Sequence, residues 1–493
     1  MANSAVLKKK VSEYMQKVDE VITNGKYKDT WESLFNYPVA KWYQDAKFGI
    51  FIHWGVYSVP AFGSEWYPRE MYRKDTEAFN HHIETYGTHD KFGYKDFIPM
   101  FRGEKFDADE WLDLFAESGA KYVMPVAEHH DGFKLYGSGL NRWNSVNMGP
   151  CRDIVGELRA ACEKRGIKLC CSNHRAEHYF YHNGGLEYPS DVSSGEYDDF
   201  YGPPHMTESK GPYQENPSAE HCEEWLATNC EMIDLYQPKV VWFDWWIQNL
   251  AWKPYLKKFA AYYYNRAIEW GEEVAINYKY DAYAYSSAVY DIERGQLSDM
   301  YGRLWQNDTA IGKKSWGYIK NNDFKKASDL TGDLVDIISK NGCLLLNVGP
   351  KPDGTITDEE TAVLKDIGKW LKINGEAVYD TAVWKIYGEG PTEIPEGAFS
   401  DTRRAGYTSE DIRFTCKAFD LYAFILKADN LSCANIKSLG KKYKRLDTVI
   451  QKASILGHDN ISVSFEQKDE CLELKFSQAL TSEHPVCVKL RLA

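Results

Sequence analysis

The sequence predicts an α/β protein, a TIM-like (β/α)8 barrel followed by a C-terminal antiparallel β-sandwich domain. Eight short apolar or β-branched segments in the first 350 residues each end in a polar or aromatic residue, with helical patterns between them. The sequence lacks the glycine-rich phosphate loop that an open doubly wound sheet usually carries after an early strand. Beyond residue 380 apolar and polar residues alternate, which is typical of antiparallel sheets.

The first 380 residues carry the elements of the barrel. Residues 8–23 have the spacing of an amphipathic helix. The eight expected strands are 48–55, 122–128, 168–173, 240–244, 274–278, 289–293, 315–319 and 343–348. Helices are expected at 107–118, 153–165, 222–236 and 329–340, each ending within two residues of Gly or Pro. We therefore expect strand and helix to alternate eight times, with the functional groups at the C-terminal ends of the strands.

Residues 381–493 form the expected second domain. Period-two segments at 411–416, 421–426, 472–476 and 486–492 are separated by turn residues, as in a β-sandwich. Because these strands hold no cluster of acids or histidines, we expect this domain to pack against the barrel. The functional site is expected within residues 1–380.

Composition narrows the class of partner. The formal net charge of −13 argues against nucleic acid and anionic membrane surfaces, which bind basic patches. No apolar run is long enough for a membrane helix. Aromatic residues make up 15% of the chain, which suits stacking on sugar rings, although core packing explains most of them. We expect a neutral ligand, and the composition is compatible with a homo-oligomer.

The cysteines and the chain start bear on the compartment. Eleven cysteines, an odd number without a repeating spacing, indicate reduced thiols. No apolar segment follows the lysines near the start, so the chain as given is expected to be cytoplasmic. A signal peptide removed earlier would instead make the protein periplasmic or secreted.

Two connections are much longer than usual in a compact domain, residues 56–105 and residues 174–220. Loops of this length are usually functional. The second is rich in Tyr, Phe, Gly and Pro, including 179–185 and 201–204. We expect it to form a rim or lid over a pocket.

Two acids end the expected fourth and sixth strands. Asp244 is flanked by aromatic residues, and a desolvated carboxylate that stays charged suits a nucleophile; a structural Asp paired with Arg would look the same. Glu293 ends the sixth strand, near enough for its carboxyl group to face Asp244 across the barrel mouth. Such a pair suggests glycoside hydrolysis, whereas a surface pair between Glu293 and Arg294 is the structural alternative.

Histidines close the first two strands. His53, His129 and His130 could bind zinc, but neighbouring strand residues point to opposite faces, so His129 and His130 would chelate poorly unless the strand has ended. Hydrogen bonds to sugar hydroxyl groups use the same groups without a metal, and we favour them. Glu65 and Trp66 add a carboxylate beside an indole face, which suits holding a hydroxyl group and stacking a ring.

Eight short motifs follow one another between residues 40 and 380. They are WYQDAKFGIFIHWG (42–55), YSVPA (57–61), EWY (65–67), HHDGF (129–133), VWFD (241–244), SWGY (315–318), LLLNVGP (344–350) and NGEAVY (374–379). In content and order they closely resemble the signature of the α-L-fucosidases of glycoside hydrolase family 29. Beyond residue 380 the similarity is looser but consistent with the family's C-terminal β-sandwich.

The resemblance implies a retaining exo-hydrolase that releases terminal α-L-fucose from oligosaccharides or glycoconjugates through a covalent glycosyl-enzyme intermediate, without metal or cofactor. Carried over by position, Asp244 is the nucleophile. The fucose pocket is lined by His53, Glu65, Trp66, His129 and His130, and we add Trp316 of the SWGY motif to the substrate-binding residues.

The chain departs from the family pattern at two places. Where many members carry a Lys-Trp-Glu segment whose Glu is assigned as acid/base, the corresponding run here looks like Leu304-Trp305-Gln306, and Gln cannot donate a proton usefully. We therefore assign this role to Glu293, with Arg294 contacting the nucleophile or the sugar, and with Glu177, Glu187 and Glu196 as fallback acids. Near the end of the third strand, where the family commonly has Tyr, this chain has Ser172-Asn173-His174, and we expect His174 to join the substrate-binding residues of the pocket instead.

These departures keep two alternatives open. One is an enzyme for a related sugar such as α-L-galactose, which differs from fucose by a single hydroxyl group and is discriminated only modestly by a pocket. The other is a catalytically silent carbohydrate-binding homologue, which Gln306 would explain.

Overall fold

The computed structural model describes residues 2–35, 37–202, 204–205 and 216–493. Part of the expected lid, Pro203 and residues 206–215, lies outside the described residues. Eight parallel strand positions form a closed barrel, because β1 pairs with both β2 and β9. The strands are β1 Phe48–Ile52, β2 Tyr122–Glu128, a third position split into β3 Lys168–Leu169 and β4 Cys171–Asn173, β5 Val240–Phe243, β6 Ala275–Tyr278, β7 Val289–Glu293, β8 Trp305–Ala310 and β9 Gly342–Val348.

The alternation of side chains separates two apolar cores. In β9, Cys343 and Leu345 face the barrel interior, while Leu344 and Leu346 face the surrounding helices. The bottom of the interior is closed by Tyr43 from helix α3 (Lys41–Ala46), which packs in the same cluster. The barrel is therefore filled from below, and only its C-terminal end is open to a ligand.

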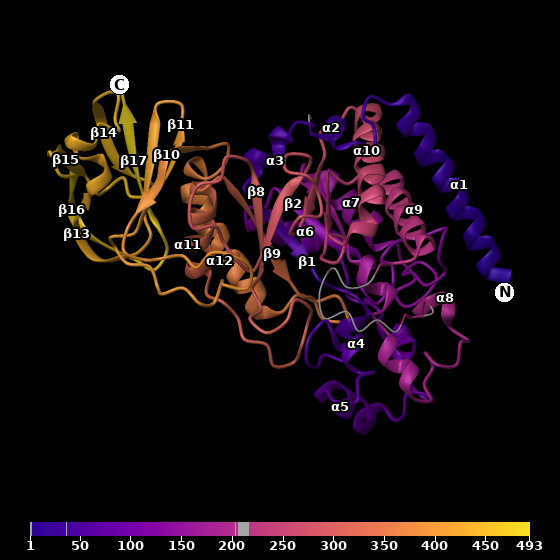
Figure 1. The fold of residues 1–493 in the computed structure, drawn as a ribbon. Coiled ribbons are helices and arrows are strands. Elements are labelled where there is room, and N and C mark those ends of the chain that lie inside the picture. Colours follow the sequence, from indigo (N-terminus) through magenta and orange to yellow (C-terminus); the bar gives the residue numbers. More distant parts are fainter. Residues whose placement is uncertain (1, 36, 203, 206–215) are drawn as a thin grey trace.

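Six large helices cover the barrel. They are α6 Ala108–Glu117, α7 Ile154–Arg165, α9 Ala219–Tyr236, α10 Lys253–Trp270, α11 Ala327–Ser339 and α12 Asp358–Asn374. The remaining helices are α1 Ala2–Asn24, which lies along α9 and α10 (Figure 1), and the short α2 Trp31–Leu34, α3 Lys41–Ala46, α4 Tyr67–Glu70, α5 Glu77–Tyr86 and α8 Asp198–Tyr201. Among the described residues, no helix has the length and apolar character needed to cross a membrane.

The expected eightfold alternation is wrong at two positions. No helix follows β6 or β7 in the fully described segments 279–288 and 294–304. Each connection is shorter than the dozen or so residues that a helical crossover usually needs. At these two positions the barrel lacks its covering helix.

The expected seventh strand at 315–319 is also wrong. The strand is β8, and residues 315–319 belong to the loop that follows it. Sequence patterning missed β8 because its inward side chains are polar rather than apolar. Gln306 is one of these side chains and is fully buried. Its Oε1 accepts hydrogen bonds from the hydroxyl groups of Tyr43 and Tyr122, and its Nε2 donates to Asp291 Oδ1 at 2.7 Å.

The C-terminal residues form two antiparallel sheets. One has the strand order β10-β11-β12-β17-β14 and the other β13-β16-β15, and they enclose one apolar core. The strands are β10 Ala382–Glu389, β11 Ile412–Lys417, β12 Asp420–Ile425, β13 Ala428–Ile436, β14 Ile450–Ile455, β15 Val463–Gln467, β16 Leu472–Ser482 and β17 Val486–Leu492. Helices α11 and α12 lie between barrel and sandwich (Figure 1), and Asp336 of α11 pairs with Arg413 of β11.

Candidate active site

A cavity of about 650 Å³ opens at the C-terminal end of the barrel strands. Every residue that the sequence analysis assigned to the site lines it: Asp244, Glu293, His53, Glu65, Trp66, His129, His130, His174, Arg294 and Trp316. Gln306 does not line the cavity but lies below it in the barrel interior. The Gln that replaces the expected Glu is thus outside the pocket.

Side-chain alternation explains why the charged groups meet. In β5, Val240 and Trp242 belong to the apolar interior, so Asp244, two residues further, continues the inward series. The same period leads from Ala275 in β6 to Lys279. In both strands, the inward-facing side chain is charged at the point where the apolar core of the barrel ends.

Asp244 is held by hydrogen bonds on both carboxylate oxygens. Oδ2 lies 3.0 Å from His174 Nδ1 and 3.2 Å from His130 Nε2. Oδ1 accepts from the Trp245 backbone N–H at 2.8 Å and from Lys279 Nζ at 3.1 Å. Burial alone would raise the pKa of Asp244, but the charge of Lys279 and the two histidine bonds hold this pKa well below its usual value. The carboxylate is therefore charged and fixed in orientation, and its cationic partner is a Lys rather than an Arg.

Lys279 connects the two predicted catalytic acids. Its Nζ donates to Asp244 Oδ1 at 3.1 Å and to Glu293 Oε2 at 2.5 Å. The distance between Asp244 Oδ1 and Glu293 Oε2 therefore cannot exceed the sum of these two bond lengths. This sum is less than the ~6.5 Å that inverting enzymes leave between their carboxyl groups for a water molecule. Burial raises the pKa of Glu293 despite the opposing charge of Lys279. The environment separates the pKa values of the two acids, which is the condition for distinct acid and nucleophile roles.

Lys279 and Asp308 are two of the charged cavity residues that the sequence did not reveal, and Lys313, Lys314 and Asp401 also line the cavity. Lys279 is nearly buried, and its Nζ lies 4.6 Å from the centre of the Trp242 ring. Asp308 of β8 lines the cavity beside Asp291, and burial together with the Asp291 charge raises the pKa of Asp308 well above its usual value. The signal that could have found Lys279 was the inward period of two in β6, whereas Asp308 lay in a strand that was not recognised.

The histidines converge because β2 ends at Glu128. His129 and His130 lie beyond the strand, so both reach the cavity instead of pointing to opposite faces. His53 Nδ1 lies 2.7 Å from Asn347 Oδ1, which fixes the ring. Burial holds the pKa values of His53 and His129 well below their usual range, so both rings are neutral and can accept or donate one hydrogen bond per nitrogen.

Two groups of side chains have the donor types of a transition-metal site. They are His53, His129 and His174, and His130, His174 and Asp244, with ligand atoms within 4.8 Å of one another in each group. The ammonium group of Lys279 beside Asp244 disfavours a cation in the second group. The same atoms suit the hydroxyl groups of a neutral sugar.

The first long loop forms one wall of the cavity. Glu65 Oε2 accepts from Ser315 Oγ and from the Trp316 backbone N–H, both at 2.9 Å, which joins this loop to the loop after β8. The Trp316 ring lies 4.7 Å from the Arg294 guanidinium group and 5.1 Å from the His53 ring. Arg294 thus lines the cavity over Trp316, and the cation bound to Asp244 is Lys279.

The second long loop contributes only His174 to the cavity lining among its described residues. Its Tyr181 packs behind Trp66, at 5.8 Å between ring centres, so this part supports the wall rather than covering the cavity. Of the fallback acids, Glu187 and Glu196 are exposed and do not line the cavity. Glu177 is buried 3.1 Å from His130 Nδ1, and burial raises its pKa to about 7.

The sandwich domain also reaches the cavity, which the sequence analysis did not foresee. Phe399, Asp401 and Thr402, in the connection between β10 and β11, line it. The backbone N–H of Phe399 donates to the carbonyl oxygen of Glu293 at 2.9 Å. The connection thus lies against the strand end that carries Glu293, where no helix follows the strand.

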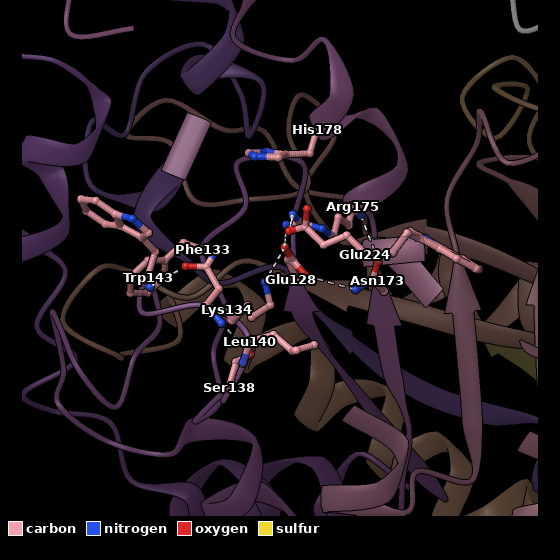
Figure 2. A network of polar contacts seen from close by, with 12 residues as sticks. Glu128, Phe133, Lys134, Ser138, Leu140, Trp143, Asn173, Arg175, His178 and Glu224 are labelled. Carbon is pink, nitrogen blue, oxygen red and sulfur yellow. Dashed lines mark hydrogen bonds and ion pairs between the residues drawn. The ribbon is translucent and has the colours of Figure 1, made fainter. Parts of the chain in front are cut away.

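A buried ionic network holds the strand ends that carry the histidines (Figure 2). Glu128 Oε1 accepts from Lys134 Nζ at 3.1 Å and from Arg175 Nη1 at 2.5 Å, and all three side chains are almost fully buried. Glu128 directly precedes His129, and Arg175 directly follows His174. The network therefore positions two cavity histidines through adjacent backbone.

Replacing Glu128 with Ala is expected to lower the free energy of unfolding by ~3–5 kcal/mol, because Lys134 and Arg175 lose the carboxylate between them. Urea denaturation followed by tryptophan fluorescence measures this loss. The control is Glu163→Ala, which breaks an exposed pair with Arg159 and should cost at most ~0.5 kcal/mol. Equal midpoints for the two variants would show that the network does not stabilise this end of the barrel.

Comparisons with known proteins agree with this geometry. The α-L-fucosidase family model matches residues 14–376. Human plasma α-L-fucosidase is 34% identical over 376 residues, covering 73% of each chain, and rat tissue α-L-fucosidase is 32% identical over 378 residues, covering 74% of each. The crystal structure of Thermotoga maritima α-fucosidase in complex with fucose superimposes with a TM-score of 0.73 at 29% identity, over 94% of this chain and all of that one. The chain therefore belongs to the α-L-fucosidase family, glycoside hydrolase family 29, and is a glycoside hydrolase.

Proposed function

We propose that this protein is a retaining exo-α-L-fucosidase that hydrolyses terminal α-L-fucose from oligosaccharides or glycoconjugates. The observation that carries the proposal is the pair of cavity carboxyl groups, Asp244 and Glu293, joined by Lys279 and shifted in pKa in opposite directions. The names of the relatives support fucose as the sugar. The cavity is closed from below, which supports attack at a chain end.

In the first step, a carboxylate oxygen of Asp244 attacks the anomeric carbon while Glu293 gives its proton to the glycosidic oxygen. The bond between sugar and leaving group breaks, and a fucosyl ester of Asp244 forms. The ester no longer carries the Asp244 charge, so the charge that raises the pKa of Glu293 disappears while the Lys279 charge remains.

In the second step, Glu293 acts as a base. With its pKa lowered, Glu293 stays deprotonated and can take a proton from water, whose oxygen attacks the anomeric carbon and releases Asp244. Two inversions give net retention. Lys279 is a positioning residue here, because it links the protonation of one acid to the charge of the other.

The test uses aryl α-L-fucoside and aryl α-L-galactoside with the same leaving group. We expect kcat/KM to be ~10- to 200-fold higher for the fucoside, because galactose carries an added hydroxyl group on the carbon that is a methyl group in fucose. Proton NMR during the first turnovers should show α-L-fucose before mutarotation. A preference for the galactoside favours the related-sugar alternative, the β-anomer contradicts retention, and binding without turnover leaves a carbohydrate-binding protein.

A further inference from the structure

Two aromatic side chains at the cavity mouth are unusually exposed. Tyr280 and Phe399 both line the cavity, and their exposed fractions are 53% and 50%. Both backbones are left-handed, with φ of 54° and 55°. A residue with a side chain adopts this region at a cost of ~1–2 kcal/mol. The fold thus maintains an unfavourable backbone at both positions where a ring is presented to solvent.

Both residues are linked to Glu293 by hydrogen bonds, Phe399 through its own backbone and Tyr280 through its neighbour Lys279. Tyr280 directly follows Lys279, whose Nζ binds the Glu293 carboxylate at 2.5 Å. The Phe399 backbone N–H donates to the Glu293 carbonyl oxygen at 2.9 Å. The two residues are therefore held near Glu293, Tyr280 by way of the Glu293 side chain and Phe399 by way of the Glu293 backbone.

The segment that carries Phe399 is held firmly against the barrel. The backbone N–H groups of Ser400 and Asp401 donate to the Arg294 carbonyl oxygen at 2.7 and 2.9 Å. Asp401 Oδ2 accepts from Lys325 Nζ at 2.5 Å and from Thr309 Oγ1 at 2.7 Å. Because these bonds fix the segment before a ligand arrives, little conformational entropy is lost when the ring makes a contact.

We propose that Tyr280 and Phe399 form the binding site for the leaving-group sugar, a hexopyranose that stacks an apolar C–H face on these rings. The inference rests on the proposed function. An acid that protonates the glycosidic oxygen must face the leaving group, so rings placed beside Glu293 at the solvent-exposed mouth border the space where this sugar lies. A half-exposed flat ring still has apolar surface that it can bury against the face of a sugar.

Phe399 gives the β-sandwich a part in specificity. It lies between β10 and β11, outside the barrel strands, yet it reaches the cavity. Since the ring touches the leaving group and not the fucose, it discriminates between substrates that share the same terminal sugar.

The test compares two substrates whose leaving groups differ in having a ring. α-L-Fucosyl fluoride has no leaving-group sugar, and the second substrate is the best fucosyl disaccharide from a panel of linkages. For Phe399→Ala and for Tyr280→Ala we expect the ratio of kcat/KM, disaccharide over fluoride, to fall about five- to twentyfold. Phe399→Trp should restore the ratio to within about twofold of the wild type, because it keeps a flat ring.

The matched control is Phe419→Ala. Phe419 is 60% exposed in the same domain, between β11 and β12, and does not line the cavity. Its ratio should stay at the wild-type value. Phe399→Leu keeps the apolar volume without a flat ring, so it tests stacking even where the Ala variant folds poorly, and its ratio should also fall.

The outcomes separate the two proposals. Wild-type ratios in Phe399→Leu and Tyr280→Ala would overturn the leaving-group site while leaving the fucosidase proposal intact. A wild-type enzyme that hydrolyses neither fucosyl fluoride nor any disaccharide would overturn the fucosidase proposal itself. Lowered ratios in both, with Phe419→Ala unchanged, support the site.

Discussion

Asp244→Asn is expected to lower kcat/KM for an aryl α-L-fucoside by at least ~10⁴-fold. The amide is isosteric with the carboxylate and keeps hydrogen-bonding capacity toward His130, His174 and Lys279, but it cannot form the glycosyl ester. Steady-state kinetics measure the loss, and circular dichroism checks that the fold is retained. The control Asp45→Asn, at an exposed pair with Lys41, should change kcat/KM by less than about twofold.

Azide adds a stereochemical test of this assignment. In Asp244→Gly the space left by the side chain admits azide, which attacks the anomeric carbon once and gives β-L-fucosyl azide from the α-substrate. Retained turnover in Asp244→Asn, or an α-azide from Asp244→Gly, would show that another group attacks the sugar.

Glu293→Ala should produce an effect that depends on the leaving group. With a poor leaving group, which needs the proton, kcat/KM should fall by ~10²- to 10⁴-fold, and with an activated aryl group much less. Azide should rescue turnover and give α-L-fucosyl azide, because it attacks an intermediate that has already inverted once. Product NMR distinguishes this anomer from the one formed by Asp244→Gly.

The pH profile gives an independent check on Glu293. The acid must be protonated for the first step, so activity falls as the pH rises through its pKa, which burial places above the usual value. This alkaline limb should disappear in Glu293→Ala. If the limb and the turnover with poor leaving groups persist, the acid lies elsewhere, and Glu177, with its pKa raised to about 7, is the next group to replace.

The sequence predicted those parts of the fold in which apolar patterning and burial agree. Strand β9 reads as CLLLNV and is apolar on both faces, so its position was evident. Strand β8 reads as WQNDTA, because its inward face turns polar in the interior, and period-two hydrophobicity could not reveal it. The motif at 315–318 was therefore assigned to a strand although it forms the loop that positions Trp316.

The same distinction applies to the site. Asp244 and the histidines were predicted because they are reactive residue types at strand ends. Lys279 occupies an equivalent place, but its role depends on two carboxylates that only the closed barrel brings within reach of one ammonium group. Phe399 could not be predicted, because nothing in a connection between two sandwich strands indicates that it returns to the barrel.

The absence of a covering helix after β7 has a consequence for how such enzymes diversify. The β10–β11 connection lies at the side of the barrel where that helix is missing. The C-terminal domain therefore supplies part of the cavity lining. If Phe399 contacts the leaving group as proposed, exchange of that domain between relatives would carry the leaving-group preference with it, while the barrel residues that line the cavity stay unchanged. Trimming the chain to its barrel would likewise leave Glu293, the proposed acid, bordered by bulk water on that side.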